Sequence, residues 1–92
     1  MEIRWTESCL GDIGSENDFL KVKNFLERSM ENLHIRTKQI KSVDKNVRRL
    51  RIGNKRLFLF FKKEFVFAIA YLDRKDAYKN ITIKNLKLLI KN

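Results

Sequence analysis

Three runs of branched and aromatic residues in the second half of the chain limit the fold more than any other feature of the sequence. They are Val47–Ile52, Lys55–Phe61 and Phe65–Leu72. Gly53-Asn54 separates the first two runs, and Lys62-Lys63-Glu64 separates the second from the third. Connections this short join antiparallel neighbours, so the runs predict a three-stranded antiparallel meander.

Two further strand features extend the sheet. The run Phe65–Leu72 is apolar at nearly every position, which is typical of a central strand covered on both faces. The segment Glu2–Thr6 alternates, with Ile3 and Trp5 on one face, and predicts a short first strand. We expect this first strand to pair with the far side of Phe65–Leu72, which gives a sheet of about four strands.

Helical spacing appears on either side of the meander. Ser15 and Asp18 have the form of a capping box, and a helix is expected from about Glu16 to Leu33. A short amphipathic helix is expected from Thr82 to Lys91. The glycines in Cys9–Gly14 predict a loop, and Ile35–Asn46 fits either a helical stretch or an irregular connection. The prediction is one α+β domain over residues 1–92, with the N-terminal helical segment on one face of a small antiparallel sheet.

Basic residues are concentrated in the middle of the chain. Residues 34 to 63 contain eleven Lys and Arg side chains and one acid, Asp44, within a chain of net charge +10. Such an asymmetry favours a polyanionic partner over a merely solvated surface. With a single cysteine, Cys9, and a single histidine, His34, an internal disulfide is impossible and a zinc site is not expected.

The Gly53-Asn54 turn predicts which side chains of the hairpin share a face. A two-residue turn places Arg51 opposite Arg56 and Leu50 opposite Leu57. One face then carries Leu50, Ile52, Leu57 and Leu59, and the other carries Arg49, Arg51 and Arg56 followed by Phe58 and Phe60. Like charges facing each other across a ladder are destabilising, which suggests that an anion binds between them. The alternative is that these arginines are solvated charges that protect a sheet edge.

A polar segment, Asp73–Lys79 (DRKDAYK), follows the last long strand. If the sheet brings this segment near the arginines, Arg74, Lys75 and Tyr78 would add cations and a phenol that can stack on a base or transfer a proton. Tyr78 could equally be an ordinary half-buried ring beneath the C-terminal helix.

The segment RLRIGNKRL, from Arg49 to Leu57, followed by an apolar strand and DRKDAY, from Asp73 to Tyr78, resembles the RelE/ParE superfamily of toxins from type II toxin-antitoxin systems. The likeness runs from Glu2 to Tyr78. It implies a RelE-like fold and ribosome-dependent cleavage of messenger RNA, in which a ribose 2′-hydroxyl attacks the adjacent phosphate without a metal or other cofactor.

The resemblance implies roles for particular residues. Arg56, Arg74 and Tyr78 match catalytic positions, at which arginines neutralise the phosphate and the tyrosine helps with proton transfer and stacks on a base. Further RNA or phosphate contacts are expected from basic residues of the same two segments, namely Arg49, Arg51, Lys55, Lys75 and Lys79. Asp73 departs from the family, because many relatives have a histidine there, and an acid at this position could lower phosphate affinity.

The resemblance also implies partners, which are a cognate antitoxin in an oligomeric complex and the ribosome with its message. The longest apolar runs, at Leu57–Phe61 and Phe65–Leu72, are too short for a spanning helix, and Met1–Leu10 has no signal-peptide stretch. No membrane partner is therefore expected, and the expected location is the cytoplasm. Two other functions remain open at this stage. One is inhibition of DNA gyrase, as in ParE-like relatives, and the other is RNA or ribosome binding without catalysis.

Overall fold

The computed structural model describes residues 1–91 and contains a five-stranded sheet in the order β1-β5-β4-β3-β2. The strands are β1 (Glu2–Trp5), β2 (Thr37–Gln39), β3 (Val47–Ile52), β4 (Lys55–Lys62) and β5 (Phe65–Asp73). The α+β class and the β3-β4-β5 meander are confirmed, as is the place of β1 beside β5. The sheet is mixed rather than purely antiparallel, because β1 runs parallel to β5.

The hairpin register is the one that the turn predicts. Arg51 lies opposite Arg56, and Leu50 lies opposite Leu57. Gly53 has a φ of 59°, a backbone conformation that glycine adopts at little cost and that a tight two-residue turn requires. A register shift between β4 and β5 occurs only beyond Phe58, so it leaves the arginine end of the hairpin in place.

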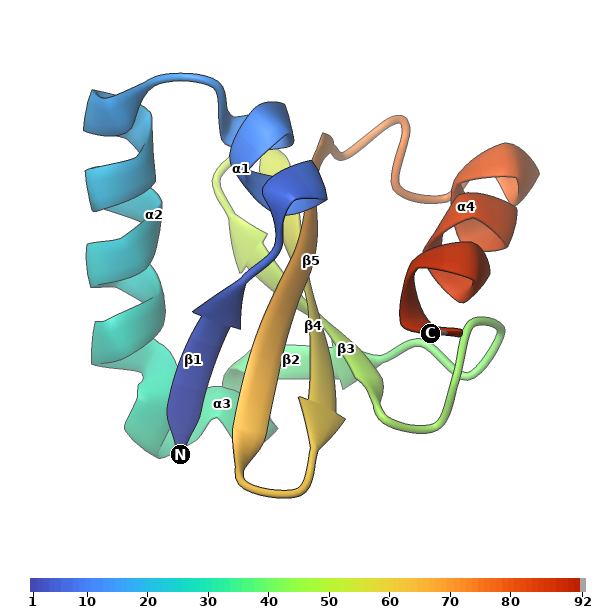
Figure 1. Cartoon of the computed structure of the whole chain (residues 1–92), viewed down its shortest axis with the longest axis horizontal. Coiled ribbons are helices and arrows are strands. Elements are labelled where there is room, and N and C mark those ends of the chain that lie inside the picture. The colour runs from blue at the N-terminus through green and yellow to red at the C-terminus, as the bar shows by residue number, and fades with distance from the viewer. Residues whose placement is uncertain (92) are drawn as a thin grey trace.

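Helices cover both faces of the sheet (Figure 1). One face packs against α1 (Glu7–Ile13) and α2 (Glu16–Ser29), and the other packs against α4 (Asn80–Ile90). A 3₁₀ turn, η1 (Met30–Asn32), and a short helix, α3 (Leu33–Arg36), connect α2 to β2. No helix within residues 1–91 is long and apolar enough to cross a membrane.

The predicted loop at Cys9–Gly14 is wrong, because most of it belongs to α1. The hydroxyl of Thr6 caps this helix by accepting a hydrogen bond from the Cys9 amide at 3.1 Å. Cys9 and Ile13, four residues apart, are both buried against the sheet, and this burial offsets the low helix propensity of Gly11. Gly14, with a φ of 90°, ends the helix.

The predicted helix from Glu16 to Leu33 is α2 with a bend at its C-terminal end. The regular helix stops at Ser29, and the chain turns through η1 and α3 to enter β2. Its apolar spacing continues through the bend, so periodicity alone did not reveal it. The segment of undecided type, Ile35–Asn46, contains the edge strand β2, which is the fifth strand of the sheet.

The sheet separates two hydrophobic clusters. Leu50, Leu57 and Leu59 face α1 and α2, whereas Phe58 lies in a second cluster with Val47 beneath α4. The predicted division of the hairpin into two faces is therefore confirmed. The second face carries its apolar residues toward one end and its arginines toward the other.

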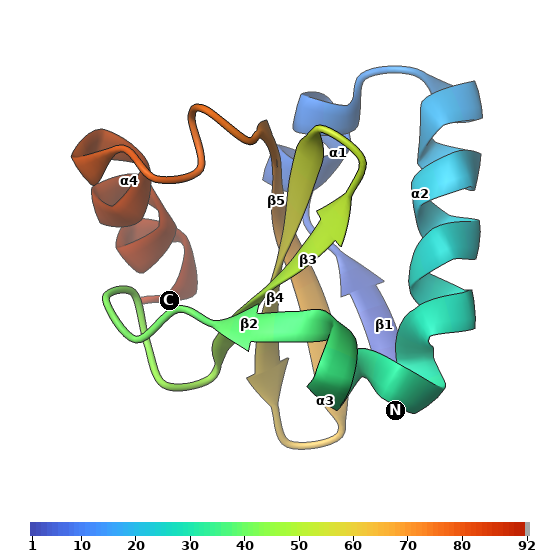
Figure 2. The same ribbon diagram turned by 180° about the vertical axis from the view of Figure 1, so that it is seen from behind.

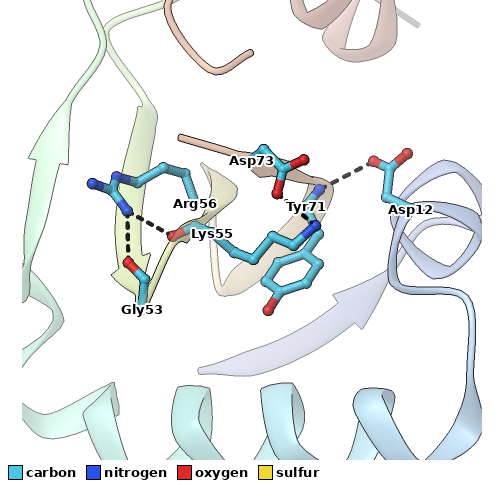
Figure 3. Close-up of polar contacts among 6 residues, drawn as sticks. All are labelled: Asp12, Gly53, Lys55, Arg56, Tyr71 and Asp73. Atoms are coloured by element: carbon cyan, nitrogen blue, oxygen red, sulfur yellow. Dashed lines mark hydrogen bonds and ion pairs between the residues drawn. The ribbon is translucent and has the colours of Figure 1, made fainter. Parts of the chain in front are cut away.

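Where β1 ends, α1 takes its place beside β5. The Tyr71 amide of β5 donates a hydrogen bond of 3.1 Å to a carboxylate oxygen of Asp12 (Figure 3). Strand β1 ends before it could pair with the Tyr71 amide, and the Asp12 side chain of α1 accepts the hydrogen bond instead. Because this contact ties α1 to the sheet, the N-terminal helices have a defined position relative to β5.

Burial should make Cys9 unreactive while the protein is folded. Its side chain is inaccessible to solvent, and burial, with a smaller contribution from Asp12, raises the pKa of its thiol from 9.0 to about 12. Near pH 8 the thiolate fraction then falls by about a thousandfold relative to the unfolded chain. We expect Cys9 to react with an aromatic disulfide reagent at least about a thousand times more slowly in the native protein than in denaturant. Equal rates in the two conditions would contradict the burial of Cys9.

Candidate nucleic-acid interface

A polar groove of about 500 Å³ lies at the arginine end of the sheet. It receives side chains from α3 and β2, from β3 and β4, and from the turn after β5. We call this set of residues the groove, and its members are Ile35, Arg36, Thr37, Lys38, Arg49, Arg51, Arg56, Arg74 and Tyr78. The groove therefore brings together five of the predicted site residues, Arg49, Arg51, Arg56, Arg74 and Tyr78. Arg74 and Tyr78 join it although the whole of strand β5 separates them from the hairpin in the sequence.

Two like-charged pairs face each other across the sheet in this groove. Arg51 lies opposite Arg56 between β3 and β4, and Lys38 lies opposite Arg49 between β2 and β3. The ion pairs found within residues 1–91 involve none of the groove cations. Cross-strand pairs of like charge are destabilising, so the groove concentrates positive charge that an anion would neutralise.

Arg56 lies at the base of the groove and is already partly engaged. Only 5% of its surface is exposed. One terminal nitrogen donates hydrogen bonds to the backbone carbonyls of Gly53, at 3.1 Å, and Lys55, at 2.9 Å (Figure 3). The side chain therefore holds the hairpin turn, and its remaining N–H groups are fixed in direction.

Tyr78 is a groove residue rather than a ring buried beneath the C-terminal helix. Its side chain is 54% exposed, and the guanidinium carbon of Arg49 lies 4.5 Å from the ring centroid. A cation over an aromatic face is favourable and keeps the ring in one orientation. The phenol is thereby held beside the arginines while much of the ring surface remains free.

Asp73 does not place a negative charge in the groove. It lies on the opposite face, where a carboxylate oxygen is 2.9 Å from the Lys55 ammonium nitrogen (Figure 3). The hydrogen bond to Asp73 is the main reason that the pKa of Lys55 is raised. Lys55 also lies 5.7 Å from the ring centroid of Tyr71, so it stands outside the groove although the sequence grouped it with the RNA contacts.

The turn after β5 is joined to the β3–β4 hairpin through its backbone. The Arg74 amide donates a hydrogen bond of 2.8 Å to the carbonyl of Asn54. This bond brings Arg74 into the groove. Lys75 instead borders a separate shallow hollow with Asn54 and Asp73, and Lys79 pairs with Asp76 at 2.9 Å. That pairing, through the hydrogen bond from Lys79, lowers the pKa of Asp76.

Sequence reasoning missed the part of the groove formed by α3 and β2. Ile35, Arg36 and Lys38 line it, but they lie in the segment whose structure was left open. Arg36 and Lys38 belong to the basic segment from residue 34 to residue 63, and this excess of positive charge is the only sequence feature that pointed to them. Because strand β2 was not predicted, the sequence offered no reason to place these residues next to Arg49.

The groove residues suit phosphate binding more than metal binding. Within residues 1–91 no group of three or more His, Cys, Asp or Glu side chains is placed to hold a metal ion. Arginine forks can hold phosphate oxygens through paired hydrogen bonds, and the exposed ring of Tyr78 can stack on a base. Charge neutralisation, base stacking and a phenolic proton are thus the chemistry that the groove can supply.

Removing one groove cation should stabilise the protein when no ligand is present. Replacing Arg51 with glutamine (Arg51→Gln) relieves repulsion of Arg56 and is expected to raise the free energy of unfolding by about 0.2–1 kcal/mol at low salt. The gain should shrink as salt screens the charges. Urea unfolding measures it, with Lys23→Gln on α2 as the control, which should bring no gain. A loss of stability in Arg51→Gln would show that the cations do not repel one another.

Comparison with known proteins finds a likeness at the level of the fold. No family model matches the sequence, and no curated protein matches it at a significant level. Among solved structures, the RelB-RelE antitoxin-toxin complex from Methanococcus jannaschii contains a similar chain, with a TM-score of 0.62 and 21% sequence identity. The match covers 82% of this chain and 94% of that one. The chain thus has a RelE-like fold, as the resemblance implied.

Proposed function

We propose that this protein is the toxin of a type II toxin-antitoxin system and that it cleaves messenger RNA on the ribosome. The observation that carries the proposal is the groove, in which cations that form no ion pair within residues 1–91 surround an exposed tyrosine. The RelE-like fold supports it, because the same fold occurs in a solved antitoxin-toxin complex.

Binding would begin with the phosphates of the message. Arg51 and Arg74 are exposed and free to turn toward an incoming phosphate, which they would hold through paired hydrogen bonds. Arg56 is fixed by its bonds to the turn, so it would meet the phosphate without losing further side-chain freedom. Together these cations would neutralise the charge that builds on the phosphate in the transition state.

The proposed reaction is an internal transfer within the RNA. The 2′-oxygen of one ribose bonds to the adjacent phosphorus as the bond from phosphorus to the 5′-oxygen of the next nucleotide breaks. The 2′-hydroxyl proton passes to water, and the Tyr78 hydroxyl gives its proton to the leaving 5′-oxygen and recovers one from solvent. The products are a 2′,3′-cyclic phosphate and a free 5′-hydroxyl.

The proposed partner of the free toxin is a cognate antitoxin in an oligomeric complex. Its acidic side chains would neutralise the groove, and an apolar helix or strand would cover nearby exposed surface. An enzyme that acts on ribosomes works in the cytoplasm, so we place the protein there.

One observation favours a second function, RNA or ribosome binding without cleavage. No histidine or carboxylate is among the residues that line the groove, so no side chain there is an ordinary general base at neutral pH. Phosphate binding needs only the cations. The two functions share the groove and differ in whether a bond is broken.

The test is to add the purified protein to ribosomes stalled on a defined message and to map cuts by primer extension. Cuts within the A-site codon are expected. Tyr78→Phe, which removes the phenolic proton, should slow cleavage by about 10²–10⁴-fold. Arg74→Ala should slow cleavage and also weaken binding, because it removes a phosphate contact.

The matched control is Tyr71→Phe, which removes a tyrosine hydroxyl on the opposite face of the sheet. It should cleave at the wild-type rate. An uncut message with the protein still bound to ribosomes would establish the binding function instead. An uncut message with inhibition of DNA gyrase would point to a ParE-like toxin.

A further inference from the structure

Ile35 is an apolar side chain placed where the fold does not need one. It is 81% exposed, more than any other large hydrophobic side chain in residues 1–91. It nevertheless lines the groove, whose other members are cations, Thr37 and Tyr78. An isolated exposed isoleucine is not unusual on a protein surface, but this one borders a site that already presents an exposed aromatic ring.

We propose that residues Ile35, Arg36 and Lys38, which we call the lip, form a second RNA subsite on α3 and β2. In it Ile35 packs against a nucleobase, and Arg36 and Lys38 contact phosphates that flank the one held by Arg51 and Arg74. This inference rests on the proposed function, since it extends the same RNA along the groove.

The length of the groove supports a second subsite. The groove is lined by residues from α3 and the edge strand β2, from β3 and β4, and from the turn that follows β5. Figure 2 shows β2, β3 and β4 from behind the view of Figure 1. Three strand spacings amount to about 14 Å, which is more than a single nucleotide spans. Ile35 lies just before β2, and the ring of Tyr78 lies against Arg49 of β3, so the groove offers an RNA two apolar surfaces as well as cations.

The lip is held in position by a side chain from outside the groove. Arg48 donates hydrogen bonds to the Thr37 hydroxyl at 2.7 Å, to the Thr37 carbonyl at 3.0 Å and to the His34 carbonyl at 3.3 Å. The Thr37 hydroxyl donates in turn to the carbonyl of Leu33. These bonds fasten the junction of α3 and β2 to β3, so Ile35 is presented on a fixed backbone.

The charges around Ile35 favour RNA over a protein segment as its occupant. Lys38 faces Arg49 directly across the sheet, and Arg36 lies on the same groove. Neither lip cation is in an ion pair within residues 1–91. A single-stranded RNA presents both phosphates and base faces, which suits a groove that has cations together with Ile35 and Tyr78. An acidic protein segment is the other occupant that the test must recognise.

The test measures binding of two oligomers by fluorescence anisotropy. One is a short 2′-O-methyl oligouridine, which cannot be cut because its 2′-oxygen is blocked. The other is an abasic oligomer with the same number of phosphates. Ile35→Ala should weaken binding of the oligouridine by about fivefold, the low end for loss of one base-packing contact. It should leave binding of the abasic oligomer unchanged, because that oligomer has no base.

The two lip cations have a different signature. The double variant Arg36→Gln, Lys38→Gln should weaken binding of both oligomers, and the slope of log affinity against log salt should fall by about 1.4, or 0.7 for each lost phosphate contact. Matched controls lie on α2, across the sheet. Leu20→Ala removes an exposed apolar side chain and should leave binding of the oligouridine unchanged. The double variant Lys21→Gln, Lys23→Gln removes two charges and should change the salt slope by less than the double variant of the lip does.

The variant Arg51→Gln separates failure of the inference from failure of the proposed function. If the wild type binds, Arg51→Gln weakens binding and the lip variants match their controls, the lip inference is overturned and the groove stands. In that case an acidic protein segment, and not RNA, would be the expected occupant of the lip. If the wild type binds neither oligomer, the proposed RNA role of the groove is wrong. The same holds if Arg51→Gln binds as tightly as the wild type. In both cases the lip inference is overturned as well. Unchanged circular dichroism in each variant excludes misfolding as the cause.

Discussion

The register of the β3–β4 hairpin is the constraint on which the rest of the structure depends. Gly53 takes the left-handed backbone conformation of a tight turn, and every residue pair that follows is set by it. A slip of one residue would move the arginines to the face of α1 and α2 and the leucines to the face of the groove. Burial of Leu50 and Leu57 therefore selects the same register that puts Arg51 opposite Arg56.

The second half of the groove depends on contacts to that hairpin. The Asn54 carbonyl accepts from the Arg74 amide, and Lys55 pairs with Asp73 across the adjoining strands. Both contacts lie at the turn or next to it. They join the hairpin to the segment that carries Tyr78, and the ion pair with Lys55 holds the Asp73 carboxylate on the opposite face of the sheet. An acid at position 73 is thus compatible with a groove whose charged residues are all cations.

The groove concentrates positive charge at a cost in stability. Hydrophobic clusters on both faces of the sheet supply the favourable free energy of folding, and they tolerate a group of repelling cations at one end. Arg56 reduces the cost by donating to backbone carbonyls, and Arg49 does so by stacking on Tyr78. No ion pair within residues 1–91 neutralises the remaining positive charge, which links the electrostatics of the free protein to its proposed ligand.

Much of the fold could be predicted from the sequence because it is encoded over short distances. The hairpin turn, the alternation of β1 and the periodicity of α2 and α4 each depend on residues within a few positions of one another. Only the tertiary structure decided that Cys9 and Ile13 belong to a helix, since their burial against β5 overrides the glycine between them. It also decided that Thr37–Gln39 is a strand, that Lys55 points away from the groove, and that Ile35 points toward it. Those outcomes depend on contacts between segments far apart in the chain, and local sequence patterns carry no information about such contacts.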